Sequence, residues 1–125
     1  MKIMFNAGKL LIGVSLGALM FITSASTVYS TSDDATRIAE GKELAFDRKK
    51  GNCLACHMIA DGSLPGNTAP PLVAMKVRFP DFDRLVNQIS NPLETNPNTL
   101  MPPFGLHDIL SEGEIMKIAE YIYTL

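Results

Sequence analysis

The sequence predicts an all-α domain. Apolar residues recur at helical spacing within residues 33–50, 81–90 and 111–125. A shorter helical turn is expected within residues 72–77. No stretch alternates between apolar and polar residues for long enough to predict a strand, so the three longer helices should form the fold.

Local signals indicate where these helices begin and end. Gly51 follows the first helix, and its last turn carries cations at residues 48–50, which suit a helix C-terminus. Pro92 ends the second helix, because proline cannot continue one. The third begins at Ser111, because Ser111 and Glu114 form a capping box, and continues to the chain end.

The residues with the clearest chemical meaning are Cys53, Cys56 and His57, which form a Cys-x-x-Cys-His motif. This is the attachment signature of a c-type haem. One helical turn brings residues three apart onto one side, so both thiols can form thioethers with one porphyrin. The adjacent imidazole of His57 then becomes the proximal iron ligand. We therefore expect one covalent haem c.

Three other roles of the cysteine pair were weighed. A thioredoxin-like redox centre needs a βαβ context, which is not visible. A zinc site would need Cys53, Cys56, His57 and His107 together, and the adjacent Cys56 and His57 would strain a tetrahedron. A disulfide would close only a very short loop and stabilise little. Haem attachment remains the best interpretation.

The N-terminus resembles a secretory signal peptide at residues 1–25, with cleavage after residue 25 to 30. Two lysines precede an apolar stretch at residues 10–22, and small residues follow it. The stretch is short for a membrane span, although an uncleaved anchor stays open. Residues 26–35 are expected to form a flexible lead-in, and residues 36–125 the haem-bearing domain.

Charge and export restrict the class of function. The whole chain has a formal net charge of −2, and removal of the two signal-peptide lysines makes it −4. This balance disfavours nucleic-acid binding, which needs a basic surface. Export predicts a periplasmic location, with no membrane attachment after cleavage.

The second axial ligand is expected to be Met101. It lies 44 residues after His57, in a Pro-rich loop, and is followed by Pro102 and Pro103. The two prolines fix φ and stiffen the segment, which suits presentation of one thioether at a set distance. A packing role for Met101 is the alternative. Other side chains considered as ligands are Met58, Met75, Met116, His107 and the lysines.

The order of these features resembles the class I cytochromes c. In that family the first and last helices cross around one covalently bound haem, with a small residue and aromatics at the contact. Gly41, Phe46 and Tyr121 match that pattern. The resemblance also implies that the Pro70 carbonyl accepts the proximal imidazole N–H. Ala69 replaces the glycine that usually precedes this proline.

Three flanking segments, at residues 46–52, 78–81 and 101–105, are similar to the SoxX family. SoxX proteins are the small monohaem subunits of SoxAX cytochromes in periplasmic thiosulfate oxidation. The resemblance implies the electron-transfer subunit of an L-cysteine S-thiosulfotransferase. It implies a SoxA-like haem subunit as heterodimer partner, the sulfur carrier SoxYZ reached through the complex, and a downstream cytochrome acceptor.

No catalytic centre is expected in this chain, since the catalytic haem belongs to SoxA. A freestanding cytochrome that shuttles electrons to an oxidase or reductase is the alternative. A haem enzyme or ligand sensor with an open iron site also stays open. Residues 48–50 are expected to contribute to a docking face, unless they only balance the helix end.

Overall fold

The regular structure of residues 31–125, the part that the computed structural model describes, is entirely helical. The four α-helices are α1 (Thr31–Phe46), α2 (Met75–Arg78), α3 (Phe82–Ser90) and α4 (Glu112–Ile122). Two short 3₁₀ turns are η1 (Cys53–Ala55) and η2 (Pro92–Glu94). The all-α prediction is confirmed.

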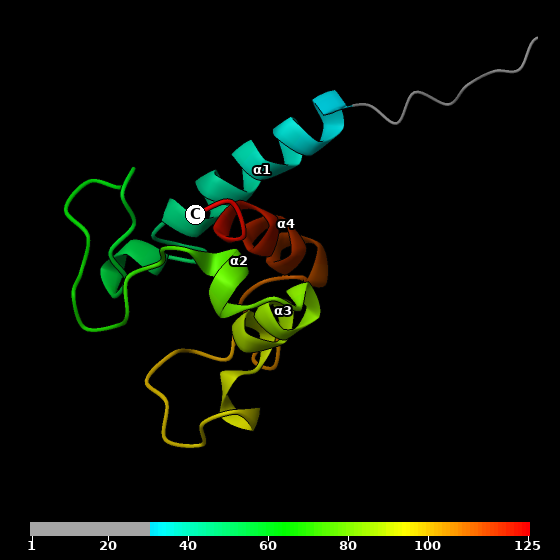
Figure 1. Cartoon of the computed structure of the whole chain (residues 1–125). Coiled ribbons are helices and arrows are strands. Elements are labelled where there is room, and N and C mark those ends of the chain that lie inside the picture. Colours follow the sequence, from blue (N-terminus) through cyan, green and yellow to red (C-terminus); the bar gives the residue numbers. More distant parts are fainter. Residues whose placement is uncertain (1–30) are drawn as a thin grey trace, which may run out of the picture.

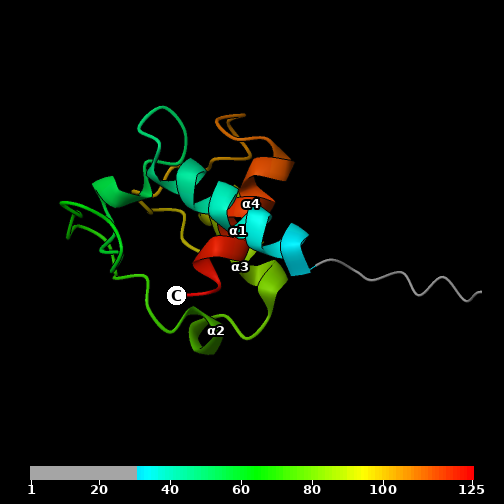
Figure 2. The ribbon, with the colours of Figure 1, turned by 90° about the horizontal axis from the view of Figure 1, so that it is seen from above.

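The first and last helices of this domain cross in direct contact. Figures 1 and 2 both show α4 lying against α1. At the contact, a Cβ added to Gly41 would lie only 1.9 Å from the carbonyl oxygen of Lys117. The rings of Phe46 and Tyr121 meet edge to face, with centroids 5.9 Å apart. Close backbone approach therefore needs a residue without a side chain at position 41.

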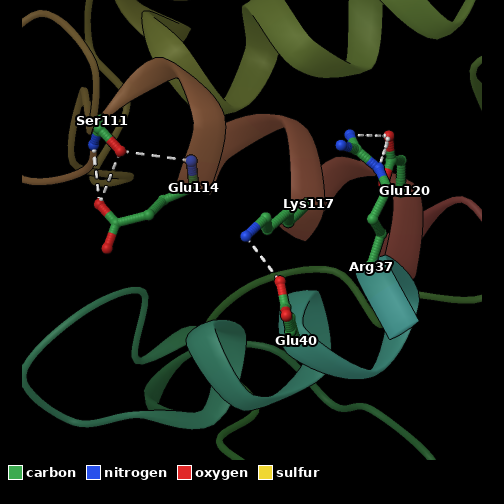
Figure 3. A network of polar contacts seen from close by, with 6 residues as sticks. All are labelled: Arg37, Glu40, Ser111, Glu114, Lys117 and Glu120. Carbon is green, nitrogen blue, oxygen red and sulfur yellow. Dashed lines mark hydrogen bonds and ion pairs between the residues drawn. The ribbon is translucent and has the colours of Figure 1, made fainter. Parts of the chain in front are cut away.

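Ion pairs border this crossing on its solvent side (Figure 3). Lys117 Nζ lies 2.6 Å from a carboxylate oxygen of Glu40, and Arg37 Nη2 lies 2.5 Å from one of Glu120. Each pair joins α1 to α4. Partly exposed pairs contribute at most about 1 kcal/mol each, so they orient the helices more than they hold them.

The core lies under the helix pair and draws on every α-helix and on the loops. Leu85 and Ile89 present the buried face of α3 to α4. The buried apolar residues are Ala45, Ile59, Met75, Leu85, Ile89, Phe104, Leu110, Ile115, Ile118, Ala119, Tyr121 and Ile122.

Side chains cap the starts of both α3 and α4, and the cap of α4 is the predicted one. The Asp81 carboxylate accepts the backbone N–H of Asp83 at 3.0 Å. Ser111 and Glu114 form the full capping box, in which the Glu114 carboxylate accepts the Ser111 N–H at 2.9 Å (Figure 3). The end of α4 differs from the prediction, because the helix stops at Ile122 before the chain end.

The end of α1 also differs from the prediction. The helix stops at Phe46, because the Asp47 carbonyl accepts the N–H groups of Lys50 and Asn52 in a tight turn. Residues 48–50 therefore lie in this turn and not in a helix. The left-handed residue is Asn52, with φ of 47°, and not Gly51. Gly51 is buried, and a Cβ there would lie 2.9 Å from a backbone oxygen of α1.

The start of α1 lies earlier than expected. The helix includes residues 31 and 32, which precede the predicted helical stretch at 33–50, and it takes in the end of the lead-in expected at 26–35. The signal peptide at 1–25, its cleavage point and residues 26–30 lie outside the described residues. Between residues 31 and 125 no helix is long and apolar enough to cross a membrane. The helical turn expected within 72–77 is α2, which begins at Met75.

Candidate functional site

The Cys-x-x-Cys-His motif begins with the 3₁₀ turn η1, which is the first helical element after α1. The carbonyl of Cys53 accepts the backbone N–H of Cys56 at 3.2 Å and that of His57 at 2.9 Å. In a 3₁₀ turn, side chains three residues apart project on the same side. Cys53 begins this turn and Cys56 follows it directly, a spacing that suits two thioethers to one macrocycle.

The two thiols have different surroundings. Cys53 lies against Gly51, where an added Cβ would come 3.3 Å from its sulfur, and burial raises the pKa of the Cys53 thiol to about 11. Cys56 is exposed, and neither cysteine is in a disulfide. Both sulfurs are therefore free for thioether formation.

His57 is oriented by a backbone carbonyl. Its Nδ1 lies 2.7 Å from the carbonyl oxygen of Pro70. Since a carbonyl only accepts, Nδ1 carries the proton and donates it, which leaves the Nε2 lone pair free for a metal. The donor set thus fits a haem iron, with one imidazole nitrogen fixed and the other available.

The segment that holds His57 is itself tied to the motif. The N–H of Ala69 donates to the Cys56 carbonyl at 3.1 Å, and the N–H of Leu72 donates to the Met58 carbonyl at 2.9 Å. These bonds lie on either side of Pro70. Alanine at position 69, in place of the family's glycine, is compatible with this arrangement.

Met101 lies in the second large loop, between α3 and α4. The backbone carbonyl of Ser90, at the end of α3, accepts the N–H of Gly105 at 2.9 Å, which closes the part of the loop that carries Met101. The Met101 side chain is half-buried against the core, and its sulfur lies 4.0 Å from Gln88 Nε2. The motif loop, at residues 47–74, carries Cys53, Cys56 and His57. Figures 1 and 2 show the two loops on the same side of the crossed helices α1 and α4, away from the first turn of α1.

The structure therefore brings Cys53, Cys56, His57 and Pro70 together and places Met101 on a separate loop. Within residues 31–125 no hydrogen bond joins Met101 to His57, and ligation by Met101 stays a prediction. Large apolar side chains are exposed on these segments, as a bound macrocycle would need. They include Met58, Leu64, Val73 and Leu100.

The other side chains considered as axial ligands differ in how deeply they are buried. Met75 is only 1% exposed and belongs to the core, whereas Met58 and His107 face solvent. Met116 is half-buried on α4. Within residues 31–125, no three Cys, His, Asp or Glu side chains gather closely enough to hold a metal ion. The four-ligand zinc alternative is not formed there.

Sequence reasoning missed Asp61, which ties the motif loop to both central helices. Its carboxylate accepts the Tyr121 hydroxyl at 2.8 Å and pairs with Lys42 Nζ at 2.5 Å. The hydrogen bond from Lys42, together with that from Tyr121, lowers the pKa of Asp61, and burial raises that of Tyr121. No local pattern marks Asp61, because its partners lie on α1 and α4.

Comparison with known proteins agrees with this geometry. Residues 36–122 match the family described as "Cytochrome C oxidase, cbb3-type, subunit III". The chain belongs to this family of cytochrome c domains. The class I cytochrome c fold is thereby confirmed, and the protein is a c-type cytochrome, an electron carrier of the extracytoplasmic space. The cysteine pair in this family is consistent with one covalent haem c.

A relative of this cytochrome is similar over part of its length. It is a protein of Aquifex aeolicus (strain VF5) described as "Uncharacterized lipoprotein", 34% identical over 76 residues. The match spans 60% of this chain and 37% of the relative. The chain thus covers little more than a third of that protein.

Proposed function

We propose that this cytochrome is the electron-transfer subunit of a SoxAX-like L-cysteine S-thiosulfotransferase of the periplasm. Cys53 and Cys56 would attach its haem, and His57 and Met101 would ligate the iron. When bound, the haem supplies a one-electron Fe(III)/Fe(II) couple. The observation that carries the electron-transfer role is the bond from His57 Nδ1 to Pro70, which fixes the ring and leaves Nε2 for the iron.

The ligand set predicts a specific spectrum. A neutral thioether favours ferrous iron, so His/Met ligation gives a high reduction potential. The ferric protein should show the weak deep-red band of a thioether–iron bond. Met101→Ala should abolish this band and lower the potential, whereas Met116→Ala, the control on α4, should change neither. A band that survives Met101→Ala would reject this ligand.

The residue inventory supports a relay and not a catalytic centre. Both cysteines of the chain stand in the motif, so no thiolate remains as a sulfur nucleophile once they are thioethers. With two axial ligands, substrate has no open coordination site. Coupling thiosulfate to a thiol releases two electrons, and one haem stores only one. The chain would therefore be filled and emptied in single steps.

The Sox assignment is supported by the three flanking segments at residues 46–52, 78–81 and 101–105. The SoxA-like subunit would be assayed with SoxYZ and a cytochrome acceptor, first alone, then with this chain, then with the Cys53→Ala, Cys56→Ala variant. We expect fast turnover only with the haem-bearing chain. Equal rates in all three mixtures, or activity from this chain alone, would overturn the assignment.

A second candidate is a freestanding carrier that serves an oxidase or reductase. The matched family's name, which refers to an oxidase subunit, favours it. The relative's description as a lipoprotein raises the possibility that such a carrier is attached to a membrane. Purification of the exported protein decides: a stoichiometric haem-bearing partner supports the SoxAX-like complex, and a monomer supports the carrier.

A further inference from the structure

The carbonyl that orients His57 belongs to a segment with few anchors of its own. Pro70 and Pro71 both lack a backbone N–H, so their carbonyls are the only backbone groups that can be hydrogen-bonded. The Pro70 carbonyl accepts the Nδ1–H of the His57 ring, and the Pro71 carbonyl accepts from Nη1 of Arg78 at 2.7 Å. Two consecutive carbonyls are thus held by two different side chains.

The backbone of Arg78 is held in place by α2 and the core. It is the last residue of α2, whose first residue, Met75, is 1% exposed in the core. The Met75 N–H donates to the carbonyl of Leu125 at 2.9 Å, which ties α2 to the chain end. Arg78 Nη1 also lies 3.5 Å from the Met75 sulfur. The guanidinium is therefore placed by the core, although the side chain itself is at the surface.

We propose that Arg78 is a positioning residue for His57, and this inference rests on the proposed role of His57 as proximal ligand. A charged donor forms a short and strong hydrogen bond, here to Pro71. Because the Pro71 carbonyl follows the Pro70 carbonyl by one residue, a fixed Pro71 restricts how the Pro70 carbonyl can turn. Arg78 thereby holds the acceptor that sets the plane of the His57 ring.

The test measures solvent exchange of the His57 Nδ1–H by NMR in the ferrous, haem-loaded protein. Arg78→Met keeps the apolar stem of the side chain and removes its donors, and Arg78→Lys keeps the charge and an ammonium donor group. Arg84→Met is the matched control, since Arg84 is an exposed arginine of α3 with no hydrogen bond or ion pair recorded within residues 31–125. Exchange of the Ile118 amide, in the middle of α4, reports global opening.

We expect Arg78→Met to speed His57 Nδ1–H exchange about tenfold, as loss of one charge-assisted bond implies. Exchange at Ile118 should change less than about twofold, because α4 keeps its packing. Arg78→Lys should recover most of the protection, and Arg84→Met should match the wild type. An unchanged His57 rate in Arg78→Met would overturn the proposal, and so would equal acceleration at His57 and Ile118.

The same spectra separate this proposal from the proposed function. If the wild-type His57 ring lacks the large ring-current shifts of an iron-bound imidazole, then the proposed ligation fails, and the positioning role fails with it. If those shifts are present and Arg78→Met leaves the exchange rate unchanged, then only the assignment of Arg78 is wrong.

Discussion

Substitution of Gly41 by alanine tests the helix crossing on which the fold depends. The added Cβ would lie 1.9 Å from the Lys117 oxygen and 2.5 Å from its carbonyl carbon. Heavy atoms pack at roughly 3.5 Å, so α1 and α4 must move apart by about 1 Å or more. Because the obstacle is backbone, no rotamer change relieves it. Such a gap loses about a quarter to a half of the dispersion energy of each contact across it.

The free energy of unfolding should therefore fall. Overpacking costs about 1–3 kcal/mol, and we expect the upper end because the clash is with backbone. Alanine is favoured over glycine within a helix by about 1 kcal/mol, which offsets part of the loss. The net destabilisation should be about 2 kcal/mol. For a domain of this size, this corresponds to a melting temperature lower by roughly 8–16 °C.

Thermal unfolding of the haem-loaded protein, followed by far-UV circular dichroism, measures this change. Gly113→Ala is the matched control, since Gly113 also lies in a helix but has nothing within 4 Å of its added Cβ. It should leave stability unchanged or raise it by up to about 1 kcal/mol. A Gly41→Ala protein that melts with the wild type, or a control that is equally destabilised, would refute the packing argument.

Three further predictions concern charge and backbone strain. The hydrogen bond from Lys50 holds the pKa of Glu114 at about 2 against the usual 4.5, so its stabilisation is present above pH 4.5 and is lost as pH falls toward 2. Glu114→Gln should flatten the dependence of the free energy of unfolding on pH between about 4.5 and 2. An unaltered pH dependence would exclude a stabilising Lys50–Glu114 pair. Neutralising Arg48 and Lys49, the exposed cations of the turn that follows α1, should slow partner association and flatten its salt dependence, whereas unchanged rates at low salt would exclude docking there. Ala74→Gly should stabilise the protein by about 0.5 kcal/mol in denaturant unfolding, because Ala74 has a φ of 49°, and a loss of stability would contradict this.

Much of the local structure could be predicted from short-range patterns. The cap of α4 was predicted because it depends only on Ser111 and Glu114, which lie three residues apart at the helix start. The hydrogen-bonded turn at Cys53, Cys56 and His57 is likewise local, because its backbone bonds join residues three and four apart. The predicted end of α1 was wrong, because the turn at Asp47 gives the backbone hydrogen bonds that compete with those of a continued helix. Helical periodicity of apolar residues does not indicate such a turn.

The sequence by itself determined that this is a helical domain with a haem-attachment motif, since both follow from residue spacing along the chain. Only the tertiary structure decided what fixes the motif in place. Asp61 meets Tyr121, Lys50 meets Glu114, and Gly41 meets Lys117, each across more than 50 residues. Such partners are brought together by the packing of α1 on α4, and no local pattern encodes which of many similar side chains will be adjacent.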